Sequence, residues 1–135
     1  MSQRLAGVSL LLMLATGCED DATDPSPLAV TGTVTYLERI AMPQGAVVTV
    51  RLEDVSRADV AAVLIGQQVI TTPGNVPVAY RVEYDGGSID DRNTYAVRAD
   101  IRANGQLWAT TTQAYLVITH GHPSSGVEIL VNRVP

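Results

Sequence analysis

The stretch Tyr95-Ala96-Val97-Arg98-Ala99-Asp100-Ile101-Arg102-Ala103-Asn104-Gly105-Gln106-Leu107-Trp108 decides the fold of this chain. From Val97 to Ala103, apolar and charged side chains alternate, which is typical of a strand with one buried face. Asn104-Gly105 then accepts positive φ at both central positions of a type I′ turn at little cost. We therefore predict a β-hairpin over residues 94–112.

The turn also sets the pairing of this hairpin. If Ala103 pairs with Gln106, Ile101 lies opposite Trp108 on the core face. The same register would turn threonines of the second strand inward. We therefore predict a β-bulge between Ala109 and Ala114 that returns the following apolar residues to the core.

The rest of the chain after Ala29 has the same period of two and no convincing helical stretch. The run Ala61–Ile65 is ambiguous between a strand buried on both faces and a single helical turn. We predict an all-β fold, a single antiparallel two-sheet β-sandwich of the Ig-like, Greek-key kind with about seven strands. The expected strands are 30–36, 46–55, 63–71, 76–84, 94–103, the second half of the hairpin, and 127–134.

The polar loop 85–93 precedes the organising strand and contains one apolar residue, Ile89. We expect Ile89 to plug the core. Tyr95 follows this loop at the start of a strand, as in the tyrosine corner of Greek-key sandwiches, where the hydroxyl ties a loop back to the body.

The N-terminus has the pattern of an export signal. Arg4 precedes an apolar run, Leu5–Ala15, which ends in small residues before Cys18. The run is shorter than the roughly 20 residues needed to span a bilayer. We expect residues 1–17 to be cleaved, residues 18–28 to form a disordered acidic tether, and residues 29–135 to form the β-sandwich domain. Ten extended tether residues reach at most about 35 Å.

The charge of the mature chain argues against nucleic acid as a partner. All nine basic residues of the 135 are arginine, and Arg4 leaves with the signal, so eight arginines face 14 acids, a net charge of −6. The single cysteine excludes a disulfide within the chain.

We expect no catalytic, cofactor or metal site and no enzymatic activity.

Three groups of polar residues are candidates for chemistry. His120 and His122 would either share a metal ion or lie in a mobile surface loop, and no third ligand stands at a recognisable spacing. The serines lack a nucleophile-elbow context. Asp90-Asp91 is better explained as a solvated turn than as a calcium pair. Separately, Arg81, Arg98 and Arg102 would either contact an acidic partner or form a solvated face, and their alternation with Glu83 and Asp100 favours the solvated face.

The segment Leu14-Ala15-Thr16-Gly17-Cys18 resembles the lipobox of bacterial lipoproteins, with Ala15 where leucine is most favoured. The resemblance implies that Cys18 is the lipidation site, carrying a diacylglyceryl group and an N-acyl chain such as palmitate. Several chains hold a protein on a membrane almost permanently, because each buried methylene contributes about 0.8 kcal/mol. Glu19, rather than aspartate, follows Cys18 and implies the outer membrane, facing the periplasm, although sorting to the inner membrane stays open.

Residues 30–134 resemble the YbaY and YscW group of bacterial lipoproteins. The resemblance rests on Thr31–Tyr36, Val50–Asp59, Asn93–Ile101, Gly105–Leu107 and Tyr115–Val117. It implies a non-enzymatic envelope lipoprotein with a β-sandwich domain, and the group includes chaperones for type III secretion outer-membrane channels.

Two classes of function stay open. The first is a protein-interaction or pilot module whose partner is an outer-membrane or secretion-channel protein. The alternative is a small-ligand or metal-binding lipoprotein facing the periplasm.

Overall fold

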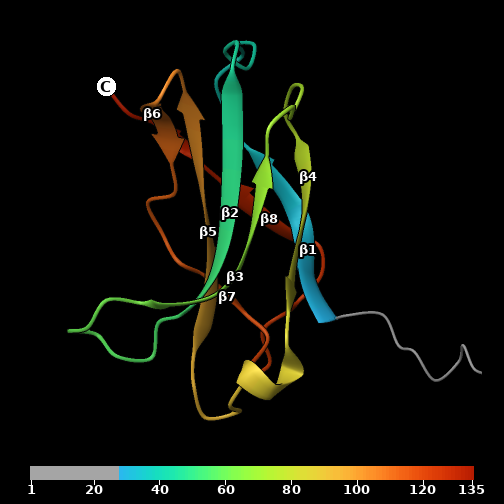
Figure 1. The fold of residues 1–135 in the computed structure, drawn as a ribbon, viewed down its shortest axis with the longest axis vertical. Coiled ribbons are helices and arrows are strands. Elements are labelled where there is room, and N and C mark those ends of the chain that lie inside the picture. Colours follow the sequence, from blue (N-terminus) through green and yellow to red (C-terminus); the bar gives the residue numbers. More distant parts are fainter. Residues whose placement is uncertain (1–27) are drawn as a thin grey trace, which may run out of the picture.

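The alternating residues form nine strands in the computed structural model, which describes residues 28–135 (Figure 1). The predicted all-β fold is confirmed, and the helical structure among residues 28–135 is limited to one short 3-10 helix, Gly86–Ser88. The first strand begins at Leu28, which pairs with Tyr84, two residues earlier than the expected start at residue 30. The strands are β1 Leu28–Thr35, β2 Ala46–Asp54, β3 Val63–Ile70, β4 Val78–Tyr84, β5 Tyr95–Ala103, β6 Gln106–Thr110, β7 Tyr115–Val117, β8 Val127–Leu130 and β9 Asn132–Arg133.

The strands form two sheets that pack as a sandwich. The smaller sheet has the order β4-β1-β8, and the larger has the order β3-β2-β5-β6-β9, with β7 also paired to β5. One pair departs from the antiparallel expectation, because β8 runs parallel to β1. The chain reaches β8 by crossing from β7 in the other sheet, and such a crossing, unlike a tight hairpin, does not impose antiparallel pairing.

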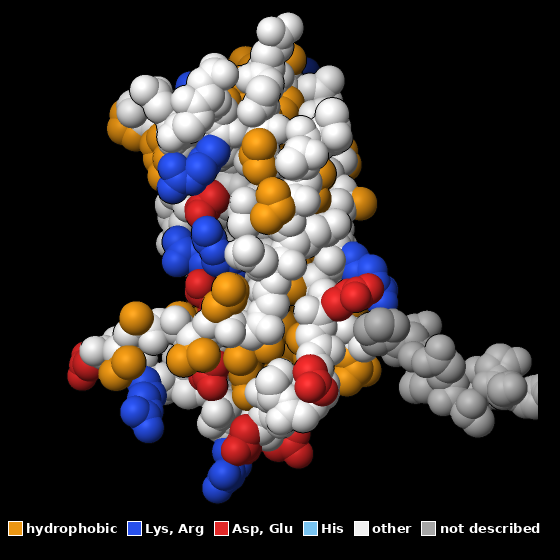
Figure 2. Space-filling model, viewed as in Figure 1, with side chains coloured by type: hydrophobic (Ala, Val, Ile, Leu, Met, Phe, Trp, Pro, Cys, Tyr) orange, Lys and Arg blue, Asp and Glu red, His pale blue; other side chains and the backbone are white. Residues whose placement is uncertain are grey.

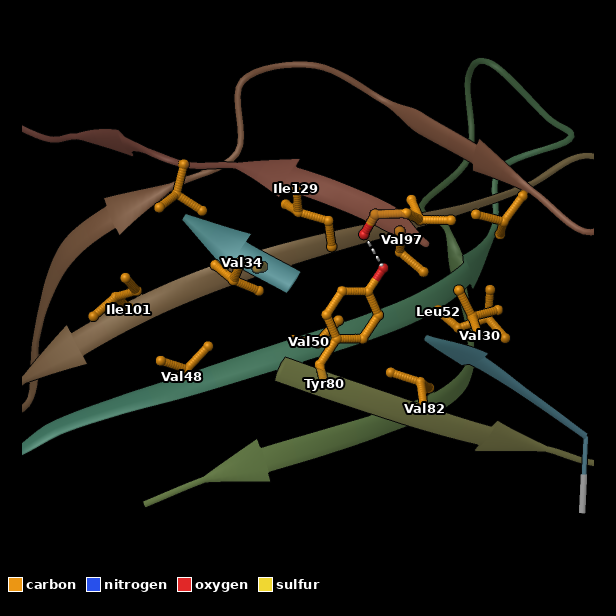
Figure 3. Close-up of a cluster of buried hydrophobic side chains, with 14 of the residues drawn as sticks. Val30, Val34, Val48, Val50, Leu52, Tyr80, Val82, Val97, Ile101 and Ile129 are labelled. Atoms are coloured by element: carbon orange, nitrogen blue, oxygen red, sulfur yellow. Dashed lines mark hydrogen bonds between the residues drawn. The ribbon is translucent and has the colours of Figure 1, made fainter. Parts of the chain in front are cut away.

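The core lies between the sheets and consists mainly of valine (Figure 3). The chain has no phenylalanine, so stiff β-branched side chains on the strands fill most of this space. Tyr95, Leu52, Ile101 and Ile129 are the largest fully buried residues. In the last segment, Val127, Ile129 and Val131 are all buried.

The predicted turn is confirmed, but the predicted register beyond it is wrong. Asn104 and Gly105 have φ of 54° and 79°, and Ala103 pairs with Gln106. The ladder then shifts between Ile101 and Arg102, so Ile101 lies opposite Ala109 and not Trp108. The bulge is therefore nearer the turn than predicted. It places small Ala109 in the buried position and leaves Trp108 only partly buried.

The predicted tyrosine corner is present in the loop before β5. The backbone N–H of Asp90 donates a 2.9 Å hydrogen bond to the hydroxyl oxygen of Tyr95, a residue that is 1% exposed. Ile89, in the same loop, is partly buried and packs against the core, as predicted. The loop is therefore fixed to the body at two adjacent residues.

Candidate functional site

The β2–β3 connection is the most prominent projection of the domain. Residues 55–64, here called the arm, extend sideways from the body (Figure 1). The β2–β3 ladder contains a bulge at its start, where Leu52 pairs with Gly66 but Glu53 pairs with Leu64. Bulges bend a strand, and this one bends β3 at the arm, while Val63 and Leu64 still pair with Asp54 and Glu53 of β2. The extra residue, Ile65, packs against the core and holds the base of the arm.

The arm exposes apolar side chains to solvent. Val60, Val63 and Leu64 are 56%, 59% and 51% exposed, and Ala61 and Ala62 between them are exposed as well. Figure 2 shows apolar side chains along this projection. The run Ala61–Ile65 is therefore a strand from Val63 onward and not a helical turn, and its outer part is not buried on either face. The sequence pattern did not reveal this exposure. The sign of it in the sequence is that apolar and polar residues stop alternating over Ala61–Ile65.

A network of hydrogen bonds fixes the base of the arm. One carboxylate oxygen of Asp54 accepts from the Ser56 amide at 2.9 Å and from the Ser56 hydroxyl at 2.5 Å. The other oxygen accepts from Asn93 Nδ2 at 3.0 Å. The Thr94 amide donates to Ser56 Oγ at 2.9 Å, and the Val55 amide donates to the Thr94 carbonyl at 2.9 Å. The arm therefore leaves the body at a fixed position.

The same network sets the charge state of Asp54. The hydrogen bond from the Ser56 side chain is the main cause that holds the pKa of Asp54 below its ordinary value of 3.8. Partial desolvation opposes it, whereas the Ser56 amide, Asn93 and the charge of Arg57 lower the pKa further. Asp54 is thus an anionic acceptor at neutral pH.

Two open clefts flank this region. One, of about 320 Å³, lies between the arm and Asn93 and joins the polar Asp54 and Ser56 to the apolar Val60 and Val63. The other, of about 310 Å³, lies beside β5 where the chain leaves the sheet between β6 and β7, and Arg98 and residues 111–114 are among its lining residues.

Arg81, Arg98 and Arg102, the arginines weighed above as contacts for an acidic partner, do not lie together. Arg81 is on β4 of the smaller sheet, and its Nε lies 3.2 Å from a Glu83 carboxylate oxygen. Arg98 and Arg102 are exposed on β5 of the larger sheet. Between them, Asp100 is only 9% exposed.

Asp100 is covered by neighbouring side chains on the outer face of the larger sheet. Arg51, on the adjacent strand, contacts its carboxylate at 3.0 Å. The Thr110 hydroxyl donates to the other carboxylate oxygen at 2.5 Å. Arg51, on the polar side of β2, therefore forms an ion pair with Asp100 and does not face water alone.

The other polar candidates lie in surface loops. His120 has a positive φ of 57° next to Gly121, and the His122 amide donates to the Thr119 carbonyl at 3.1 Å. Within residues 28–135, no three His, Cys, Asp or Glu side chains are grouped so as to hold a metal ion. Asp90 pairs with Arg92 at 2.9 Å, and hydrogen bonds from Arg92 lower the pKa of Asp90 to about 2.

The predicted lipidation site, Cys18, lies outside the described residues, as do the signal segment and nearly all of the tether. Among residues 28–135, no helix has the length and hydrophobicity to cross a membrane.

The described residues therefore define an all-β, sandwich-type domain with an exposed apolar arm. Comparison with known proteins identifies the family. The chain belongs to the family described as type III secretion system lipoprotein chaperone (YscW), whose sequence profile matches residues 25–129.

Two relatives agree with this assignment. The chain is 26% identical to the uncharacterized lipoprotein YbaY of Escherichia coli (strain K12), an alignment that covers 86% of this chain and 71% of YbaY. A solved structure of an alternative pilotin from the type II secretion system of Vibrio cholerae matches with a TM-score of 0.73 and 37% identity. That match covers 81% of this chain and 100% of the pilotin. The predicted resemblance to the YbaY and YscW group is therefore confirmed.

Proposed function

We propose that this protein is a lipid-anchored, non-enzymatic pilot of the bacterial envelope, which binds a subunit of an outer-membrane secretion channel and assists its assembly. The observation that carries the proposal is the likeness to the Vibrio cholerae pilotin, which extends over the whole of that chain at 37% identity. The family description, a secretion-system lipoprotein chaperone, points the same way.

The anchor in this proposal is Cys18, at the end of the lipobox-like segment. Acyl chains there would hold the domain at the outer membrane, facing the periplasm, with the acidic tether between lipid and domain. Lipidated protein should partition into the detergent phase of a Triton X-114 separation, and Cys18→Ser should move it to the aqueous phase. Wild-type protein already in the aqueous phase would show that Cys18 carries no anchor.

The pilot role is tested by following the channel subunit in cells. With the wild-type chain, the subunit should fractionate with the outer membrane on a density gradient. Without it, the subunit should accumulate in the inner membrane or be degraded. Cys18→Ser is the matched variant. It keeps the domain that would bind the channel subunit and removes the lipid anchor that would bring the subunit to the outer membrane. Normal outer-membrane assembly in cells that lack this protein would contradict the proposal.

A further inference from the structure

We infer that the arm, residues 55–64, docks an extended segment of the channel subunit that combines apolar side chains with lysine or arginine. The inference rests on the proposed function, because it names the surface that this function would use and the chemistry of the segment bound there. Its evidence is the exposed apolar surface, the unpaired edge and the charge around the arm.

The first step is the apolar surface. Five consecutive apolar residues, Val60–Leu64, are exposed, and three of them are more than half exposed. Folding alone does not require such a run at the tip of a projection. Removing it from water would stabilise a complex in proportion to the apolar area covered.

The second step is the free edge of β3. Further along the strand, β3 lies against β4, because a Cβ on Gly66 would stand only 2.6 Å from the Glu83 carbonyl oxygen, and Gln68 Oε1 accepts from the Arg81 amide at 2.6 Å. Before Gly66, β3 turns away into the arm. Val63 and Leu64 there pair with β2 alone. Their other edge is open to an added strand.

The third step is the charge around the arm, which determines the kind of segment that can bind there. Residues 54–64 and 85–93, at the same end of the domain, contain five aspartates and two arginines, and Arg92 is already paired with Asp90. Figure 2 shows acidic side chains on the arm and below it. A second copy of this chain, an anionic bilayer and the acidic tether would all be repelled. A basic segment would be attracted.

The composition of the arm also argues against membrane insertion. Interfacial membrane elements combine lysine or arginine with tryptophan, phenylalanine or leucine. This chain has no lysine and no phenylalanine, and the arm carries a single arginine, Arg57.

The hydrogen bonds of Asp54 further hold the base of the arm in one conformation, which reduces the entropy lost on binding.

The test uses the purified full-length lipidated protein and the purified channel subunit. The double variant Val60→Ser/Leu64→Thr removes the apolar surface at exposed positions. We expect it to weaken binding about tenfold or more, as is typical when central apolar contacts are lost. The matched controls Val69→Thr, on the same strand within the body, and Leu37→Ser, exposed elsewhere, should bind as wild type does. Binding should also weaken as NaCl is raised.

A photo-crosslinking residue at position 60 gives an independent readout. It should crosslink to the channel subunit, whereas the same residue at position 37 should not. If the subunit binds but crosslinks from position 37, or binds the double variant normally, the inference is overturned and the pilot function stands. Crosslinking only to phosphatidylglycerol–phosphatidylethanolamine vesicles, or to a second copy, would also overturn it. If the wild type does not bind the subunit at all, the proposed function fails and the inference fails with it.

Discussion

The Tyr80 hydroxyl donates a 2.9 Å hydrogen bond to the backbone carbonyl of Val127, inside the core and across an intervening strand (Figure 3). Tyr80 is on β4, Val127 is on β8, and both pair with Gly32 of β1. The absence of a side chain at Gly32 allows the phenol to reach from one edge of the smaller sheet to the other. Burial raises the pKa of Tyr80, so the hydroxyl keeps its proton.

Tyr80→Phe should destabilise the fold by about 1–3 kcal/mol, because the buried Val127 carbonyl loses this partner. Tyr36→Phe is the matched control. Its hydroxyl donates to the carbonyl of Ile40, an exposed residue whose carbonyl water can reach after the substitution. Urea unfolding measures both. Equal losses in the two variants would show that the Tyr80 bond has no special role in the core.

Gly32→Ala should cost about 3 kcal/mol or more, at or above the upper end of overpacking effects. A Cβ at this position would overlap the carbonyl oxygen of Val127, and the parallel β1–β8 pair would have to separate. Gly87→Ala is the control, because its nearest contact would be an ordinary 3.5 Å from Asp85 Oδ1. If Gly32→Ala unfolds at the wild-type urea concentration, the close approach of β8 to β1 is wrong.

The sequence predicted those features that depend on neighbours along the chain. Alternation located the strands, and Asn104-Gly105 predicted its turn, because each depends on local geometry. The tyrosine corner was found for the same reason, since Asp90 and Tyr95 are only five residues apart.

Features that depend on distant packing were missed. The bulge at Trp108 depends on which side chain fits beside Ile101 between the sheets, and the parallel β1–β8 pair joins residues nearly 100 positions apart. The arm was missed as a site because exposure of Val63 and Leu64 depends on where β3 leaves the body. An apolar run by itself predicts burial.

Trp108→Ala should cost about 2 kcal/mol, less than the roughly 3–5 kcal/mol of a fully buried tryptophan. Trp108 is partly buried, its ring meets that of Tyr36 edge-on at 5.2 Å, and Arg133 lies 4.4 Å above its centroid. Arg133→Ala should therefore uncover the indole and shift its fluorescence to longer wavelength, with little loss of stability. Emission that does not change in Arg133→Ala would contradict this contact.

Ser56→Ala should raise the pKa of Asp54 toward its ordinary value of 3.8. The folded-state pKa is depressed, so the ionised carboxylate stabilises the base of the arm above the unfolded-state pKa. This contribution is lost as pH falls through the folded-state pKa.

Carboxyl-carbon NMR titration should give a midpoint below 3.8 in the wild type and a higher one in Ser56→Ala. The stability difference between the two proteins should shrink on acidification. Ser88→Ala removes a hydroxyl that donates to the Asp85 carbonyl and should leave Asp54 unchanged. The same Asp54 midpoint in the wild type and Ser56→Ala would show that Ser56 does not hold the arm through this carboxylate.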